Sequence, residues 1–217
     1  MRNHLKWKYC FSLCALAVLA LPSSAGASIL YSNLASPNSL SSVSLSSTAW
    51  AANGFTTDGN VYTMSDVIVA LEGVARGGSV TVSLYNKVGS APGSSLATVG
   101  AIADSALSTS SFTQQQVNTN ILLSPNTSYF IVLSGSSAAG VDALWERENG
   151  FSGTGVAGQI WATSADGGST WSPHLVSSDF QPLLMQVDVL ATPEPGTVFG
   201  ALGGLALILM GRRRRAG

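Results

Sequence analysis

Short apolar runs with a period of two residues recur along the middle of this chain, and clusters of Gly, Pro, Asn and Asp separate them. Residues 79–85 (SVTVSLY) are the clearest case, because Val80, Val82 and Leu84 alternate with Ser, Thr and Tyr side chains. Such alternation places the apolar side chains on one face of a β-strand. No window shows a sustained helical period. The middle of the chain is therefore expected to be all-β.

Nine segments carry strand patterns: 28–33, 49–56, 61–71, 79–85, 111–117, 128–133, 143–147, 159–163 and 184–190. Turn residues lie between them, at 58–60 (DGN), 77–78 (GG), 91–93 (APG), 125–126 (PN) and 166–168 (DGG). Strands at this spacing favour an antiparallel two-sheet sandwich over a fold of alternating strands and helices. A jelly roll is the version of the sandwich that we expect.

Charge divides the chain into three parts. Residues 1–27 hold three basic residues and no acidic one, residues 28–191 hold three basic and ten acidic residues, and residues 192–217 hold four arginines and Glu194. The formal net charge of −1 is thus the sum of an acidic body and two basic ends. An acidic body argues against nucleic-acid binding, which needs Lys and Arg on the contact surface. Each basic end borders an apolar run, which argues against a cytosolic protein.

Residues 1–27 have the parts of a signal peptide. Three basic residues precede an apolar run at 9–21 (YCFSLCALAVLAL), which is expected to be a signal helix. Ala25 and Ala27 then satisfy the small-x-small rule, so we expect signal peptidase to cut after Ala27. A retained membrane anchor is the alternative, and the shortness of the run argues against it.

Both cysteines, Cys10 and Cys14, lie inside this leader. The mature chain then has no cysteine, which excludes a disulfide and a thiolate metal site. Cys14 follows Leu13 rather than the small residue expected before a lipid-modified cysteine, so a lipoprotein anchor is not expected.

Residues 192–217 combine a proline motif, an apolar run and a basic cluster. Pro193, Glu194 and Pro195 come first, and the two prolines keep the backbone extended. The apolar run at 196–211 (GTVFGALGGLALILMG) would be about 24 Å long as a helix, which is short against a hydrocarbon core of about 30 Å. Bilayer thinning and long arginine side chains can cover the difference. The chain then continues with Arg212, Arg213, Arg214 and Arg215. A cluster of this kind stays in the cytoplasm, which leaves the body outside.

This order of proline motif, Gly-rich apolar helix and arginine cluster resembles the PEP-CTERM sorting signal of exported bacterial proteins. The resemblance implies recognition by an exosortase, a membrane-embedded cysteine transpeptidase that cuts near the Pro-Glu-Pro motif and removes the tail. It implies that 193–195 are the sorting motif and 212–215 the stop-transfer cluster. It also implies a Gram-negative bacterium that makes exopolysaccharide and lives in biofilms or flocs. A plain C-terminal anchor without processing is the alternative.

The Ser-rich body at 28–191 resembles the choice-of-anchor domains, most nearly those of type R. The segments 50–57 (WAANGFTT), 129–134 (YFIVLS) and 166–171 (DGGSTW) carry this likeness, which covers residues 45–190. The resemblance implies an exported β domain of the kind found with various surface anchors. It supplies no catalytic residues that could be carried over.

Side chains suited to catalysis or metal binding are few in the body. His174 is its one histidine, which excludes a multi-histidine metal site. A catalytic triad would have to combine His174 with Asp166 or Asp179, and no Gly-x-Ser-x-Gly elbow is present. The Asp-Gly segments at 58–60 and 166–168 are interpreted as turns rather than metal sites. We expect no catalytic residue, no metal and no cofactor.

Glu146 and Glu148 form a carboxylate pair on one face of a predicted strand, beside Trp145. Glycoside hydrolysis needs only two carboxylates, so the pair is a candidate hydrolytic site. A hydrated strand face, with Arg147 pointing the other way, is the preferred interpretation.

Four tryptophans lie in the body. Exposed tryptophans can stack on sugar rings, whereas buried ones fill the core. Core filling is predicted for Trp50 and Trp161. Trp171, which follows a Gly-rich turn, and Trp145, which adjoins the carboxylate pair, are the candidate carbohydrate contacts.

Together these observations predict an exported, non-enzymatic bacterial surface or extracellular-matrix protein. It would be anchored transiently in the inner membrane with its body in the periplasm, and then released to the cell surface or matrix. Signal peptidase and exosortase are its expected partners during export, and extracellular polysaccharide is its candidate partner afterwards. The alternative is a secreted polysaccharide-active hydrolase that uses Glu146 and Glu148.

Overall fold

The computed structural model describes residues 26–35, 41–74, 77–138, 140–147, 153–155, 160–175 and 182–191. The body, Ala27–Ala191, forms one compact unit. Most of the predicted leader, including Ala25, and the whole sorting segment with Pro193, Glu194, Pro195 and the four arginines lie outside the described residues. Within the ranges that are described, no helix has the length and hydropathy needed to cross a bilayer.

The described part of the body consists of strands and one short 3-10 helix. They are β1 (Ala27–Ser32), β2 (Ser42–Leu45), β3 (Trp50–Thr56), β4 (Tyr62–Gly73), β5 (Ser79–Val88), β6 (Ala91–Ala103), η2 (Asp104–Ala106), β7 (Thr113–Leu123), β8 (Ser128–Gly135), β9 (Ala143–Glu146), β10 (Ile160–Ser164), β11 (Ser172–Leu175) and β12 (Met185–Ala191). The all-β prediction is confirmed, and each of the nine predicted segments overlaps a strand. The sequence patterns did not indicate β2, β6 or β11.

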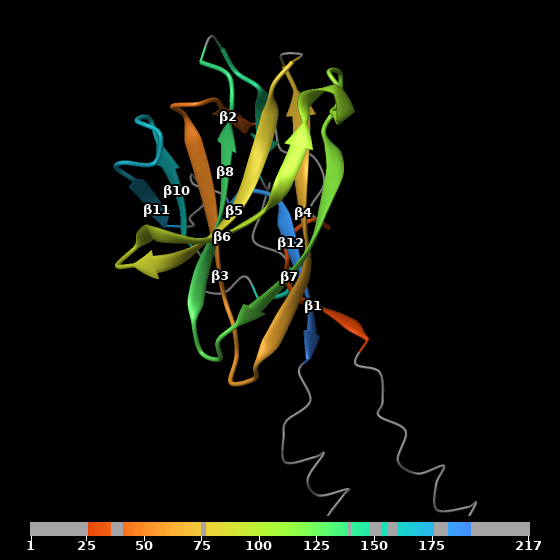
Figure 1. Cartoon of the computed structure of the whole chain (residues 1–217), viewed down its shortest axis with the longest axis vertical. Coiled ribbons are helices and arrows are strands. Elements are labelled where there is room, and N and C mark those ends of the chain that lie inside the picture. The colour runs from red at the N-terminus through yellow and green to blue at the C-terminus, as the bar shows by residue number, and fades with distance from the viewer. Residues whose placement is uncertain are drawn as a thin grey trace, which may run out of the picture. The chain divides into compact units, whose positions relative to one another are not determined.

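The strands form two antiparallel sheets (Figure 1). In sheet A the order is β1-β12-β4-β9-β2, and β7 pairs with β4 as well. In sheet B the order is β11-β10-β3-β8-β5-β6. Ala27 pairs with Leu190, so the first and last strands of the body lie side by side, and the body begins and ends at the same end of the sandwich.

The main hydrophobic core contains side chains from both sheets, as an antiparallel sandwich requires. On β5 of sheet B, Val80, Val82 and Leu84 are buried, as the period-two pattern predicts. On sheet A, Val67 of β4 and its cross-strand neighbour Val187 of β12 are buried as well. Full burial of a side chain of this size contributes about 1.5–3 kcal/mol to stability, so the core is the main driving force for this fold.

The predicted turn at 91–93 is wrong, because these residues begin β6. The chain reverses just before them, at Gly89, whose φ of 61° suits glycine. Proline has no backbone N–H to donate to a neighbouring strand. Pro92 is compatible with a strand here because β6 lies at the edge of sheet B, where a strand can lack an N–H without losing a hydrogen bond of the sheet.

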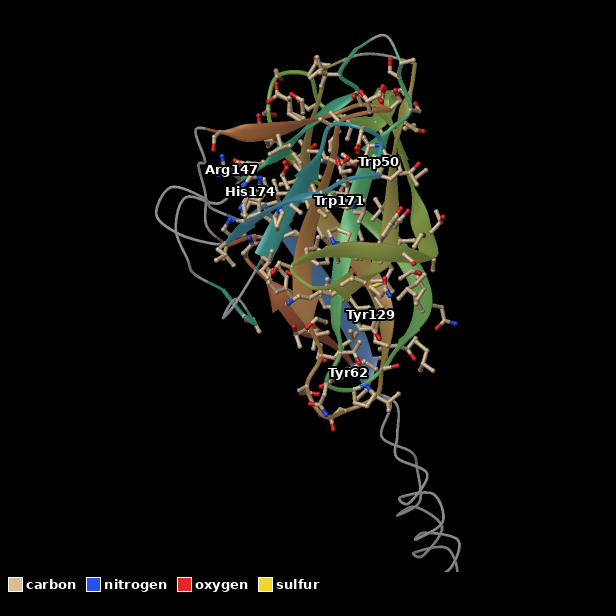
Figure 2. All side chains as sticks on the ribbon, turned by 90° about the vertical axis from the view of Figure 1, so that its left-hand side faces the viewer. Trp50, Tyr62, Tyr129, Arg147, Trp171 and His174 are labelled. Atoms are coloured by element: carbon tan, nitrogen blue, oxygen red, sulfur yellow. The ribbon has the colours of Figure 1, made fainter. Side chains whose placement is uncertain are left out.

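The hairpin of β5 and β6 bends over the outer face of sheet B. The register between the two strands shifts at Val82/Ser83, Leu84/Tyr85 and Tyr85/Lys87. Bulges of this kind bend a strand pair and increase its twist. As a result β6 contacts β8 and also β10, which is four strands away in the sheet order, and Figure 2 shows the yellow-green hairpin crossing in front of the sheet.

Buried asparagines connect both sheets to the segment that leads into β12. The carbonyl oxygen of Leu183 accepts hydrogen bonds from Nδ2 of Asn33 (3.0 Å) and Nδ2 of Asn53 (2.8 Å). Asn33 follows β1 of sheet A, and Asn53 lies in β3 of sheet B. Oδ1 of Asn33 also accepts a hydrogen bond from the backbone N–H of Met185 (2.7 Å). The start of β12 is therefore fixed from two sides.

We expect Asn33→Ala to destabilise the protein more than Asn53→Ala. Asn33→Ala removes two buried hydrogen bonds and should lower the free energy of unfolding by about 2–4 kcal/mol, whereas Asn53→Ala removes one and should cost about 1–2 kcal/mol. Urea unfolding of the two variants and the wild type at pH 7 measures the difference. A larger loss in Asn53→Ala would contradict the greater role of Asn33.

Candidate functional site

A second apolar cluster lies on the face of sheet B that points away from the main core. Side chains alternate between the two faces of a strand. On β8, Ile131 and Leu133 belong to the main core, so Phe130 and Val132 point outward. We call this cluster the outer patch. Its members are the buried Ala52, Phe130, Val132 and Ala162 and the half-buried Trp50, Tyr85, Ile160 and Trp171.

The ring of Trp50 is held at the outer patch by its neighbours. Its Nε1 donates a hydrogen bond to the carbonyl oxygen of Ser47 (3.0 Å). The turn at 166–168 lies against the ring, since a Cβ on Gly168 would come within 2.5 Å of two of its carbons. Gly168 also has a φ of +82°, so the position suits glycine for two reasons. The prediction that Trp50 fills the core is wrong, because its outward position on β3 leaves it half-buried.

Asp166 organises the turn that precedes Trp171. Its carboxylate accepts hydrogen bonds from the backbone N–H of Thr170 (2.8 Å), from Oγ1 of Thr170 (2.6 Å) and from Oγ of Ser164 (2.8 Å). These bonds, those from Thr170 first, lower the pKa of Asp166 to about 2. Gly167 and Gly168 both have positive φ, so the interpretation of 166–168 as a turn is confirmed. The carboxylate thereby fixes the backbone immediately before Trp171.

Trp171 is half-buried and packs against the outer patch. Figure 2 shows Trp50 and Trp171 on the same side of the body. The next residues along the chain on either side, Thr170 and Ser172, are exposed hydroxyl residues. Trp171 therefore stays a candidate carbohydrate contact.

Trp145 lies in the main core with 0 % of its surface exposed. Its Nε1 donates a hydrogen bond to the carbonyl oxygen of Leu184 (2.8 Å). The prediction that Trp145 contacts carbohydrate is wrong, because its place on β9 turns the ring inward. Trp161 is 4 % exposed, which confirms its predicted role in the core.

His174 is part of a stack of side chains rather than an exposed loop residue. Its ring lies 4.2 Å from the ring of Trp161, centroid to centroid, and the guanidinium carbon of Arg147 lies 4.8 Å from the centroid of the Trp161 ring. Oγ1 of Thr163 and Nε2 of His174 are within hydrogen-bond distance at 3.2 Å. Burial, and then the positive charge of Arg147, lowers the pKa of His174, so the imidazole is neutral at pH 7.

The structure describes only one residue of the predicted carboxylate pair. Glu146 is half-buried at the end of β9, and Glu148 lies outside the described residues, as does Asp179. The hydrolytic alternative therefore stays a prediction.

A carboxyl pair that the sequence patterns did not indicate lies on sheet A. Asp66 of β4 and Asp188 of β12 are cross-strand partners. Ser65 donates a hydrogen bond to Asp66 (3.0 Å), and Gln186 donates to both carboxyl oxygens of Asp188 (3.0 Å each). Burial raises the pKa of Asp188, the bond from Gln186 opposes this shift, and the negative charge of Asp66 adds to it. The two residues are far apart in sequence, so only strand pairing joins them.

We expect Asp188→Asn to stabilise the protein near neutral pH. A carboxyl group with a raised pKa in the folded state stabilises the fold when protonated, and this contribution is lost as the pH rises through the folded pKa. The variant removes one of two opposed like charges and should gain about 0.2–1 kcal/mol at pH 7, but nothing at pH 3. Urea unfolding at pH 3, 5 and 7 measures the gain.

Asp58→Asn is the control for this experiment. The backbone N–H of Asn60 and then the hydroxyl of Tyr62 lower the pKa of Asp58, so its contribution is present at neutral pH and lost on acidification. The control should therefore lower stability at pH 7. A gain in both variants, or a pH-independent gain in Asp188→Asn, would contradict the like-charge pair.

The chain has no match among known protein families, and no curated protein matches it. It is similar to two solved virus structures. One is the structure of infectious bursal disease virus Gx strain, at 15 % identity and a TM-score of 0.34, and the other is that of the Gt strain, at 14 % and 0.31. Each similarity covers 91 % of this chain and 52 % of the viral chain, so this protein spans about half the length of either. Similarities of this size carry no argument about function.

Proposed function

We propose that this chain is an exported, non-enzymatic bacterial surface or matrix protein whose body contacts extracellular polysaccharide. The observation that carries the proposal is the outer patch, where Trp50, Tyr85 and Trp171 are half-buried on one face of sheet B. Flat aromatic rings can stack on the C–H faces of a sugar, and neighbouring hydroxyl groups can form hydrogen bonds with the hydroxyls of the sugar. Serine and threonine are abundant in this body, and charged residues are few.

The strand order supports a jelly roll as the scaffold of this surface. Sheet A contains the neighbours β1-β12-β4-β7, and sheet B contains β3-β8-β5-β6. The order of these eight strands is the one expected of two Greek keys wound into a double sheet, which supports the jelly-roll proposal. The strands β2 and β9 to β11 are then additions to this framework. Two of them, β10 and β11, extend sheet B next to the outer patch and carry Trp171 at their connection.

The position of the body's two ends supports processing at both. Ala27 and Leu190 are paired, so the expected signal-peptidase site lies beside the last strand of the body. Residues 26–29 are exposed, as a cleavage site must be. Removal of both ends would leave the outer patch intact, since no residue of the patch lies in β1 or β12.

The sorting route is proposed from the sequence of 192–217. Pro193, Glu194 and Pro195 would be recognised by exosortase, the apolar run at 196–211 would hold the chain in the inner membrane, and 212–215 would stay in the cytoplasm. Cleavage near the proline motif would then release the body to the cell surface or matrix.

Trp171→Leu should weaken polysaccharide binding, because leucine keeps apolar packing but has no flat ring to stack on a sugar. We expect the wild-type protein to be retarded in native gels that contain xylan, hydroxyethylcellulose or alginate, and the variant to bind at least about tenfold more weakly, or about 1.4 kcal/mol. Tyr62→Leu is the matched control, because Tyr62 is an aromatic residue of β4 and is not part of the patch.

Two results would contradict the polysaccharide contact. One is the absence of retardation in every polymer, and the other is an equal loss of binding in Tyr62→Leu. Release of reducing ends that disappears in Glu146→Gln and Glu148→Gln would instead favour the hydrolase.

Glu194→Ala, or replacement of the four arginines at 212–215 by serine, should leave uncut protein in the inner-membrane fraction. The first change removes the acidic residue of the proposed recognition motif, and the second removes the cluster that holds the tail in the cytoplasm. Cell fractionation shows where each variant accumulates, and the intact mass of the recovered protein shows whether the N-terminal and C-terminal segments have been removed. Glu72→Ala, a change within β4 of the body, is the control. Unchanged secretion and mass in the Glu194 and arginine variants would exclude the sorting route.

A further inference from the structure

Four connecting segments meet at the end of the body opposite to Ala27 and Leu190. Gly78 precedes β5, Asp104 follows β6, Ser136 follows β8 and Asp142 precedes β9. The pairing of Ser79 with Ala103 and of Val80 with Gly135 brings three of these segments together. Two aspartates that are far apart in sequence thus come to the same place in the fold.

Both aspartates are buried and incompletely bonded. Asp104 is 2 % exposed and Asp142 is 0 % exposed. Oδ2 of Asp104 accepts a hydrogen bond from the N–H of Gly78 (2.9 Å), and Oδ2 of Asp142 accepts one from the N–H of Ser137 (2.8 Å). Oδ1 of each residue is buried without a hydrogen-bond partner. Buried carboxylates with open lone pairs are costly unless a positive charge compensates them.

Oxygen atoms from three of the segments converge beside Gly78. A Cβ on Gly78 would lie 2.5 Å from Oδ1 of Asp142, 2.8 Å from Oδ2 of Asp104 and 2.8 Å from Oγ of Ser136. A Cβ on Gly135 would likewise collide with Oδ2 of Asp142. The two glycines therefore leave room for the carboxylates to approach each other. Because all three oxygens lie this close to one position, they are near enough to one another to be ligands of a single cation held clear of the Gly78 Cα, since Ca–O bonds are about 2.3–2.6 Å long.

No basic side chain of the described residues lies at this cluster. Lys87 is near the tip of the β5–β6 hairpin, and Arg147 lies over the ring of Trp161. Burial raises the pKa of Asp104, the bond from Gly78 opposes the shift, and the negative charge of Asp142 adds to it. Arg76, the third basic residue of the body, lies outside the described residues, so the pair has no positive partner among the residues that the structure describes.

We propose that Asp104, Asp142 and Ser136 bind a hard divalent cation, with Ca²⁺ as the best match. Two carboxylates neutralise its charge, and a hydroxyl oxygen is an acceptable third ligand. Ca²⁺ tolerates irregular geometry and fills its remaining positions with water or carbonyl oxygens, whereas Mg²⁺ demands a near-ideal octahedron. Among the described residues no three His, Cys, Asp or Glu side chains are placed to hold a metal ion together, so the third ligand from a side chain at this site is the hydroxyl of Ser136. Bound Ca²⁺ would fasten three connections together at one end of the body.

Calcium titration of the full-length chain, freed of metal by chelation, tests this proposal. Equilibrium dialysis against CaCl₂ up to 5 mM should give one saturable site, and the melting temperature should rise with Ca²⁺ and fall again with EGTA. Asp142→Asn and Asp104→Asn, which remove one charge each, should weaken binding at least about tenfold. Ser136→Ala keeps both carboxylates and should weaken binding by about threefold, which tests the site even if the aspartate variants do not fold.

Asp188→Asn is the matched control, because it removes one carboxylate from the other carboxyl pair, and both oxygens of Asp188 accept hydrogen bonds from Gln186. It should leave calcium binding unchanged. The proposal is overturned if the wild type takes up no Ca²⁺ by 5 mM, or if Asp188→Asn loses as much binding as Asp142→Asn. It is also overturned if Ca²⁺ and EGTA leave the melting temperature unchanged while stability falls from pH 5 to pH 8. That last result would assign a shared proton to the pair instead.

Discussion

The carbonyl oxygen of Leu183 is the point at which both sheets hold the last strand. It accepts amide hydrogen bonds from Asn33, next to sheet A, and from Asn53, within sheet B. The described body contains no cysteine, so burial and hydrogen bonds must hold the sheets together. Trp145 adds another buried side-chain bond to this segment, through the carbonyl oxygen of Leu184. Because β12 pairs with both β1 and β4, its placement decides the order of sheet A and brings the two ends of the body together.

Close packing on the outer face of sheet B depends on glycine at two positions. Gly54 has no side chain, and a Cβ there would come within 2.9 Å of the carbonyl oxygen of Ile160 and 3.3 Å of the ring of Phe130. Gly168 allows the turn before Trp171 to lie on the ring of Trp50. The same face therefore has a buried apolar floor and half-buried aromatic residues, and these are the features on which the proposed polysaccharide contact rests.

The proposed functions use different parts of the body. Processing would take place where β1 and β12 run side by side, polysaccharide contact would use the outer patch, and cation binding would use the connections at the opposite end of the strands. This separation has a simple physical cause. Strands of a sandwich carry their chain reversals to its two ends and leave the sheet faces free.

The sequence by itself determined the fold class, because period-two burial is a local property of residues such as Val80, Val82 and Leu84. It also determined the turn at 166–168, where glycine and aspartate have strong local preferences. It missed β6, since an edge strand with Pro92 and exposed residues has no alternation to detect. Only the tertiary structure decided that Trp145 lies in the main core and that Trp50 is half-buried on the outer face of sheet B. The direction of a side chain depends on which side of its strand meets the other sheet. It alone decided that Asp104 lies beside Asp142, because strand pairing, not spacing along the chain, brings their connections together.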